Sequence, residues 1–446
     1  MKIITETSKK ILFTTFQIIV FFLVIPALTY SQNTISNNSL TEVNPPGSPG
    51  GGVVQAIVGA RLIDGLGGEP IENSVVILEG NRIKTVGVVG DIEIPENAKV
   101  VNAEGQTLLP GLVDAHFHSV NNNEVLNQFL RNGVTSMRDP GHPFRFYQAL
   151  DFAKNPVPRM FLTGSHLDGY PGVYKDHALL VKDSGHAREM VHQYAKNGSS
   201  GIKIYFRLPL KYYEPIVQAA DFHGIPVFAH LELVDADDAI RAGVSGIEHV
   251  SSFGTAIAEP SAAEEFRKAV ERNSNNRREG RYKLWAGIDL EADRVKDVIK
   301  LAADKKIFFC PTLATFERQS GGQGVEDYHV QAFENMLKFV GMAHDAGVTI
   351  VTGSHTHSKY VEMGWAYQRE MELLVKAGLS PDETIKASTS MNAKYFRSSE
   401  RIGSIEPGKM ADLILVEGNP SSSISEMYNI RKVMINGKWV DNSVVE

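Results

Sequence analysis

The sequence has almost no cysteine and no cluster of basic residues. Cys310 is the only thiol among 446 residues, so the chain can form neither an intramolecular disulfide nor a zinc site built from several thiolates. The net charge is −7, whereas a nucleic-acid-binding protein normally presents a basic face. With 43% apolar and 22% charged residues, the chain has the composition of a folded globular protein. We therefore expect no nucleic-acid partner and a chemistry that does not use thiolates.

The N-terminal residues are organised differently from the rest of the chain. Three lysines precede an apolar stretch over residues 11–27, and small residues follow it. This layout is typical of a secretory signal, and we expect residues 1–31 to be a signal peptide cleaved before Gln32. An uncut membrane anchor is the alternative, because about 20 apolar residues can span a bilayer. Both interpretations predict export to the periplasm or the extracellular space.

Two β-rich regions flank the central part of the chain. Residues 32–52 are mainly Asn, Ser, Pro and Gly, a composition that predicts a flexible linker. Residues 53–109 follow with short apolar segments separated by Gly and Asn, which indicate strands and hairpins. The C-terminal residues repeat this pattern, with a tight turn expected at Asn436-Gly437.

The central part alternates short apolar segments with amphipathic, helix-like stretches. This alternation predicts βαβ units and a parallel sheet. Eight strands with intervening helices over roughly 280 residues fit a (β/α)8 barrel, which typically takes about 250. The excess lies near residues 255–290, which we expect to form a helical insertion after the sixth strand. The candidate strands are residues 111–116, 134–139, 159–164, 201–206, 226–230, 246–250, 307–312 and 348–353.

Histidines stand at the ends of several of these strands. A lone histidine there is usually a hydrogen-bonded surface residue, and a lone lysine in a strand usually extends its ammonium to water. Four imidazoles at the ends of three strands are a different pattern, because neutral imidazole is a preferred zinc ligand and barrel chemistry takes place at the carboxyl ends of strands. The sequence therefore predicts a metal site near His116, His118, His230 and His249, with Lys203 in the fourth strand between apolar neighbours.

Several ordered motifs carry a resemblance to a known family. They are LLPGLVDAHFH, GVTSMRDPG, AIRAGVSGIEHV, CPTL and IGSIEPGKMADLILVEGNP. In these motifs the chain resembles the amidohydrolase superfamily, in particular its imidazolonepropionase-like and Xaa-Pro dipeptidase-like members. The resemblance implies an α/β fold, with a (β/α)8 TIM barrel over residues 110–395 and a small β-sandwich domain formed by residues 53–109 and 396–446.

The resemblance also implies a metal-dependent hydrolase that cleaves an amide or cyclic-amide C–N bond, as in a dipeptide, with a metal-bound hydroxide. Residue by residue, His116 and His118 match ligands of the more buried of two zinc ions, and His230 and His249 match ligands of the second. Lys203 matches a lysine that becomes carboxylated and bridges both ions. The expected partner is a small-molecule substrate, with membrane contact only through the N-terminal segment and a homo-oligomer left open. Deamination of a heterocyclic base is a weaker alternative within the same superfamily.

The end of the eighth strand departs from the family pattern. The family places a metal-ligating, proton-accepting aspartate there, and this chain has His355 in the phrase Gly353-Ser354-His355-Thr356-His357. Three interpretations stay open. His355 replaces the carboxylate as a ligand, or His355 or His357 acts as the catalytic base, or the protein has lost or weakened hydrolysis and keeps the scaffold.

Three further residues are candidates for substrate binding. Tyr205 and Arg207 follow the fourth strand, where an arginine can bind a carboxylate through a bidentate contact or can simply lie on the surface of a loop. His166 follows the third strand, in a loop that either reaches the substrate or caps the barrel.

Overall fold

The structure is a computed structural model that describes residues 42–43, 52–118, 122–144 and 156–440. The expected signal peptide lies outside the described residues, as does most of the expected linker. Within the linker, strand β1 (Glu42–Val43) pairs antiparallel with β9 (Arg159–Leu162). The helices in the described part of the chain are all too short or too polar to cross a membrane.

One mixed sheet joins the two β-rich regions. Its strand order is β19-β18-β17-β6-β2-β3-β4, and β5 pairs with β2. The join is the antiparallel pairing of β6 with β17. As expected, Asn436 and Gly437 form the turn between β18 and β19, both with positive φ. The division into two facing layers stays a prediction. The strands are β2 (Val54–Leu62), β3 (Ile71–Glu79), β4 (Arg82–Val88), β5 (Lys99–Asn102), β6 (Gln106–Pro110), β17 (Leu413–Glu417), β18 (Ile430–Ile435) and β19 (Lys438–Trp439).

All eight strands expected in the central part are present. Each pairs in parallel with at least one other central strand, and most of their residues are buried, which is typical of parallel sheets covered on both faces. Besides β9 they are β7 (Leu112–Asp114), β8 (Val134–Asp139), β12 (Ile202–Ile204), β13 (Val227–His230), β14 (Gly246–Glu248), β15 (Phe308–Cys310) and β16 (Thr349–Ile350).

These strands form two sheets and not one closed ladder. The third expected strand, residues 159–164, ends early at Leu162, and Gly164, with a φ of 75°, interrupts the extended backbone after it. Before the interruption, β9 pairs with β8, and after it β10 (His166–Asp168) pairs with β12 and with β11 (Ala178–Leu180). The sequence did not predict β10 or β11. A backbone hydrogen bond of 3.0 Å from Ala115 to Thr352 links β7 to the segment after β16 at the other boundary.

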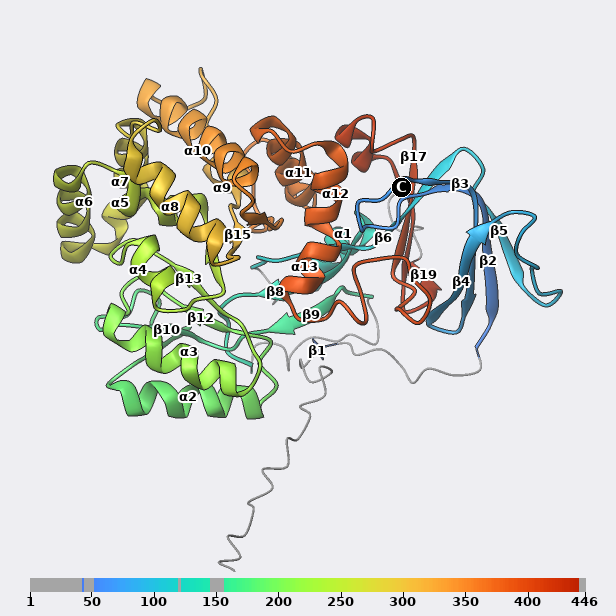
Figure 1. Ribbon diagram of the computed structural model, residues 1–446, viewed down its shortest axis with the longest axis horizontal. Helices are drawn as coiled ribbons and strands as arrows, with labels where there is room; N and C mark the ends of the chain where they lie inside the picture. The colour runs from blue at the N-terminus through green and yellow to red at the C-terminus, as the bar shows by residue number, and fades with distance from the viewer. Residues whose placement is uncertain (1–41, 44–51, 119–121, 145–155, 441–446) are drawn as a thin grey trace, which may run out of the picture. The chain divides into compact units, whose positions relative to one another are not determined.

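Helices lie between the strands, and an insertion follows β14 (Figure 1). As expected, the insertion is helical, with α5 (Gly254–Ile257), α6 (Pro260–Arg272) and α7 (Arg277–Ala286). The other helices are α1 (Asn123–Arg131), α2 (Ser184–Lys196), α3 (Tyr213–Phe222), α4 (Ala236–Arg241), α8 (Asp293–Asp304), α9 (Leu313–Phe316), α10 (Asp327–Asp345), α11 (Ala366–Ala377), α12 (Pro381–Ser388) and α13 (Ser390–Tyr395).

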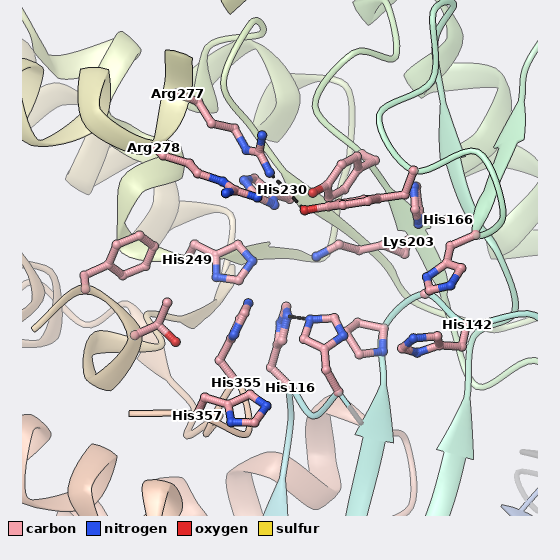
Figure 2. A pocket seen from close by; sticks show the side chains of 18 of the residues that line it. His116, His142, His166, Lys203, His230, His249, Arg277, Arg278, His355 and His357 are labelled. Carbon is pink, nitrogen blue, oxygen red and sulfur yellow. Dashed lines mark hydrogen bonds between the residues drawn. The ribbon is translucent and has the colours of Figure 1, made fainter. Parts of the chain in front are cut away.

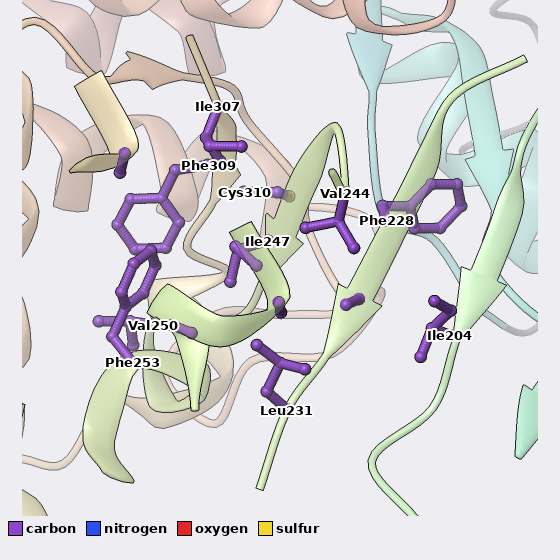
Figure 3. Close-up of a cluster of buried hydrophobic side chains, with 14 of the residues drawn as sticks. Ile204, Phe228, Leu231, Val244, Ile247, Val250, Phe253, Ile307, Phe309 and Cys310 are labelled. Atoms are coloured by element: carbon purple, nitrogen blue, oxygen red, sulfur yellow. The ribbon is translucent and has the colours of Figure 1, made fainter. Parts of the chain in front are cut away.

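The core beneath the functional residues is apolar and closely packed. Ile247 of β14 and Phe309 of β15 are fully buried in a cluster that includes Val250 and Phe253 (Figure 3). His249 stands between Ile247 and Val250 in the sequence, so packing on both sides restricts its backbone. The strand ends are therefore a rigid platform for the polar side chains that follow them.

Candidate metal centre and substrate cavity

A cavity of about 740 Å³ lies at the carboxyl ends of the parallel strands. Nine of the fourteen histidines line it, and several of them stand at the end of a strand or a few residues after it. No Asp or Glu is among the described residues that line the cavity. The nine are His116, His118, His142, His166, His177, His230, His249, His355 and His357.

His116 and His118 come from the end of β7 and face the same space. Their Nε2 atoms are 3.2 Å apart, because residues two apart on an extended chain point to the same side. Burial, together with the positive charge of Lys203 and the neighbouring imidazoles, lowers the pKa of both histidines well below the usual value. Neutral imidazoles with converging nitrogens are the form in which histidine binds metals.

Glu248, the last residue of β14, sets the orientation of His116. Its carboxylate contacts Nδ1 of His116 and accepts hydrogen bonds from Arg138 at 2.7 Å and from the Tyr395 hydroxyl at 2.9 Å. With the proton on Nδ1 held by Glu248, the lone pair of Nε2 is directed at the cavity. Carboxylates hold metal-binding histidines in this way. The sequence did not identify Glu248 or Arg138, because nothing in the local pattern separates a buried ion pair from surface charges.

His230 and His249 approach from β13 and from the residue after β14. Their rings are 4.4 Å apart, and the ring of His249 is 4.5 Å from that of His116. Nδ1 of His249 bonds to the hydroxyl of Thr312 at 2.7 Å, and Nε2 of His230 bonds to Glu232 at 3.1 Å. Each ring therefore keeps one nitrogen free of these contacts. Burial lowers the pKa of both imidazoles well below the usual value.

Lys203 of β12 is an orphaned buried cation. It is 3% exposed, and its Nζ has no hydrogen-bond partner among the described residues. Burial lowers its pKa to about 8. An ammonium without a partner is destabilising in a protein interior, so this position fits a group that supplies one. With the imidazoles around it (Figure 2), the donor set fits a divalent metal ion.

The end of β16 brings His355 into the same cluster. Its ring stacks on His116 at 5.2 Å with an interplanar angle of 15°, and ligand atoms of His116, His249 and His355 lie within 4.8 Å of one another. Its backbone N–H donates to the His116 carbonyl at 2.8 Å. Burial lowers the pKa of His355 to about 4. His357 also lines the cavity but is exposed at its edge.

Backbone geometry at these positions is unusual. His249, His355 and Thr356 are non-glycine residues with φ of 71°, 53° and 70°. The left-handed region is unfavourable for such residues and persists where the surroundings enforce it, often at functional sites. Asp114 supplies part of that support, because one of its oxygens accepts the backbone N–H groups of His116 and Ser354, both at 3.0 Å.

Two of the three substrate-binding candidates line the cavity. Tyr205 and His166 have ring centroids 4.4 Å apart, and Nε2 of His166 is buried without a hydrogen-bond partner. Burial lowers the pKa of His166 to about 3. Arg207 is not among the lining residues, and a carboxylate contact for it stays a prediction. Its guanidinium donates to the Val270 and Glu271 carbonyls and the Ser274 hydroxyl, at 3.2, 2.9 and 2.8 Å.

The insertion contributes residues that the sequence analysis did not assign. Arg277, Arg278 and Arg281 of α7 line one side of the cavity with Tyr174. His142 lines it too, with Nδ1 bonded to Asp139 at 2.7 Å. The charged composition of residues 255–290 was the available signal, but composition alone does not say which charges face inward.

The sequence model described as the amidohydrolase family matches residues 107–440. The chain belongs to the amidohydrolase family. This family consists of hydrolases that act on carbon–nitrogen bonds, and its fold is of the TIM-barrel type with a parallel sheet. The expected superfamily is thereby confirmed.

Individual relatives of this amidohydrolase are distant. An adenine deaminase of Mesorhizobium japonicum is 23% identical over 388 residues, which are 82% of this chain and 54% of the relative. The chain thus spans about half the length of that curated relative. Among solved structures, phenylurea hydrolase B has a TM-score of 0.69 at 21% identity, covering 88% of this chain and 98% of its own. A Xaa-Pro dipeptidase with bound methionine has a TM-score of 0.66 at 21% identity, covering 87% and 100%. At these identities the likeness shows the fold.

Proposed function

We propose that this amidohydrolase is an exported, metal-dependent enzyme that hydrolyses an amide or cyclic-amide C–N bond. One observation carries the proposal, namely that five imidazoles from four strand ends converge beside the unpartnered ammonium of Lys203. The family membership supplies the reaction class. Export rests on the basic and apolar pattern of residues 1–31, and the barrel of residues 110–395 with its β-sandwich rests on the resemblance.

In this proposal the cluster holds two zinc ions. His116 and His118 would bind one ion, and His230 and His249 the other. The neutral amine of Lys203 would add to CO2 and release a proton, and the resulting carbamate would be an anionic ligand for the ions. Bound ions supply Lewis acidity to water and to the substrate carbonyl. Glu248 and Thr312 keep the ligand nitrogens of His116 and His249 directed at the centre.

We assign His355 as a metal ligand. Its ring lies within the ligand cluster, and its position against His116 leaves no room for a substrate between them. A base that works near neutral pH needs a pKa near neutrality, and the burial of His355 opposes that. His357, at the exposed edge of the cavity, is then the candidate proton acceptor.

Metal content and activity together test the proposal. Residues 32–446, purified with zinc and bicarbonate and without chelator, should contain two ions per chain and hydrolyse members of a panel of dipeptides, N-acyl amino acids and cyclic amides. His357→Gln should lower kcat at least tenfold and keep the metal content. Full metal content without hydrolysis of any panel member would contradict the proposal.

Two alternatives have distinct outcomes. If the missing strand-end carboxylate has weakened catalysis, His355→Asp should raise hydrolysis by tenfold or more, whereas a ligand role for His355 predicts no such gain. Deamination of a heterocyclic base, which the adenine deaminase relatives favour, predicts release of ammonia from adenine by the unmodified protein.

A further inference from the structure

The charge of the cavity is opposite to that of the chain. The protein carries a net charge of −7, yet the cavity is lined by four cationic side chains and, among the described residues, by no carboxylate. These cationic side chains are Lys203, whose positive charge the proposed carbamate would remove, and, on another side, Arg277, Arg278 and Arg281 of α7.

The three arginines differ in how their charge is compensated. Arg281 donates to Glu232 at 2.9 Å, and that carboxylate neutralises it. Arg277 donates at 2.7 Å to the Ser274 carbonyl and at 3.1 Å to the Tyr174 hydroxyl, both of them neutral groups. Neither Arg277 nor Arg278 forms an ion pair with a carboxylate in the described part of the chain.

Arg277 is the more informative of these two residues. It is 5% exposed, and its Nε is buried without a hydrogen-bond partner. The carboxylate of Glu232 acts on Arg277 without forming an ion pair with it. A buried guanidinium without a direct ion pair is expected where a ligand completes it. Arg278 is exposed and reaches the cavity from the next position of the helix. Both side chains extend toward the centre of the cavity, from the side opposite His116 and His355 (Figure 2).

The hydroxyl of Tyr174 is also affected by these arginines. Burial raises the pKa of its hydroxyl, but the positive charge and hydrogen bond of Arg277, together with hydrogen bonds to Tyr205 and Arg278, lower the pKa overall. A site that favours a phenolate also favours a carboxylate, and two adjacent guanidinium groups offer the planar donors that a carboxylate binds in bidentate fashion.

We propose that Arg277, Arg278 and Tyr174 form a subsite for a carboxylate of the substrate, with the scissile C–N bond directed at the histidine cluster. This inference rests on the proposed function and narrows it to anionic amides, such as N-acyl amino acids or peptides with a free C-terminus. The cavity, about 740 Å³, is of the size that holds small-molecule ligands. The α7 insertion thus acts as the specificity element of the site.

Calorimetric titration of the metal-loaded full chain with N-acetyl-L-leucine and with N-acetyl-L-leucinamide tests the subsite, since the two probes differ mainly in charge. The acid should bind at least tenfold more tightly than the amide. Arg278→Gln should weaken binding of the acid about tenfold and leave the amide unchanged. Lys283→Gln, which removes a positive charge from an exposed position of the same helix outside the cavity, should alter neither. Arg277→Met serves as a second variant if it folds.

Equal affinity for both probes, or an acid affinity in Arg278→Gln within twofold of the unmodified protein, would overturn the subsite. If the carboxylate of the acid bound only at the metal centre, Arg278→Gln would bind the acid as tightly as the unmodified protein does. This binding test of the subsite can be distinguished from the activity test of the proposed function. Selective binding of the acid by a protein that hydrolyses nothing supports the subsite and refutes the activity. Equally fast hydrolysis of neutral and anionic amides supports the activity and refutes the subsite.

Discussion

Glu248 contacts Nδ1 of His116 across the boundary between the two central sheets, because β7 and β14 belong to different sheets. The carboxylate also accepts from Arg138, which is fully buried and lies over the rings of Phe228 at 3.8 Å and Tyr395 at 4.1 Å. This buried network connects the two sheets directly behind the proposed metal ligands. The orientation of His116 therefore depends on packing between the sheets as well as on its own strand.

Replacing Glu248 with Gln should weaken metal binding while the ligands themselves stay in place. The amide has the shape of the carboxylate but no charge, so it holds the Nδ1 proton of His116 less strongly. Loss of such a supporting group typically lowers metal affinity by about 10- to 100-fold. Competition with a chromophoric chelator measures the affinity. Glu317→Gln, at a buried carboxylate that pairs with Arg369 and does not line the cavity, is the control and should bind metal normally. Unchanged affinity in Glu248→Gln would contradict the orienting role.

Gly353 is required by the close approach of β7 to the segment after β16. A Cβ at this position would lie 2.5 Å from Sγ of Cys310 and 2.7 Å from Cβ of His116. Gly353→Ala should therefore destabilise the protein by about 1–3 kcal/mol, the usual range for overpacking, and should reduce metal content because it displaces His116. Gly68→Ala is a matched control, since nothing lies within 4 Å of a Cβ there. Denaturant unfolding and metal analysis measure both effects, and a stable, fully loaded Gly353→Ala would show that the strands separate easily.

The sequence was sufficient for the strands and for the histidines at their ends, because both depend on local patterns. It was not sufficient where tertiary contacts determine which strands pair and which charged side chains are buried or face the cavity. Gly164 lies between β9 and β10, which belong to different sheets, although an isolated glycine does not predict a change of sheet. Arg207 and Arg278 are the same residue type, and the sequence does not distinguish their roles. The guanidinium of Arg207 donates to carbonyls at the end of α6, whereas Arg278 reaches the cavity. The charged Glu248 likewise gives no local sign that it is fully buried.

Glu370 of α11 should impose a pH dependence on stability that is independent of the metal centre. Its oxygens accept the backbone N–H groups of Leu313 and Ala314 at 2.8 and 2.7 Å, and burial raises its pKa from 4.5 to about 8. Between these values the folded state holds a proton that the unfolded state has released. The contribution of Glu370 is therefore greatest below about pH 4.5 and is lost as the pH rises toward 8.

In Glu370→Gln this dependence should disappear. The stability of the unmodified protein relative to the variant should fall as the pH rises from 5 to 8, by on the order of 1 kcal/mol per pH unit. Urea denaturation of metal-free samples across that range measures the difference. A difference that stays constant, or that grows with pH, would show that the two backbone N–H groups keep the carboxylate ionised.

Lys203→Met should have opposite effects on the metal-free and metal-loaded protein. Without metal, the variant removes a buried ammonium that has no hydrogen-bond partner, and the apolar side chain fits beside Phe228, whose ring lies 5.4 Å from Nζ. Its free energy of unfolding should therefore rise by about 1–3 kcal/mol. With zinc and bicarbonate, the variant should bind fewer ions than the unmodified protein, and bicarbonate should no longer affect its metal content. Lys283→Met, at an exposed position of α7, should change neither quantity.

Denaturation with a chelator present, and elemental analysis with and without bicarbonate, separate the two effects. A less stable metal-free variant would show that Nζ has a partner in the folded protein, and an unmodified protein indifferent to bicarbonate would exclude the carbamate.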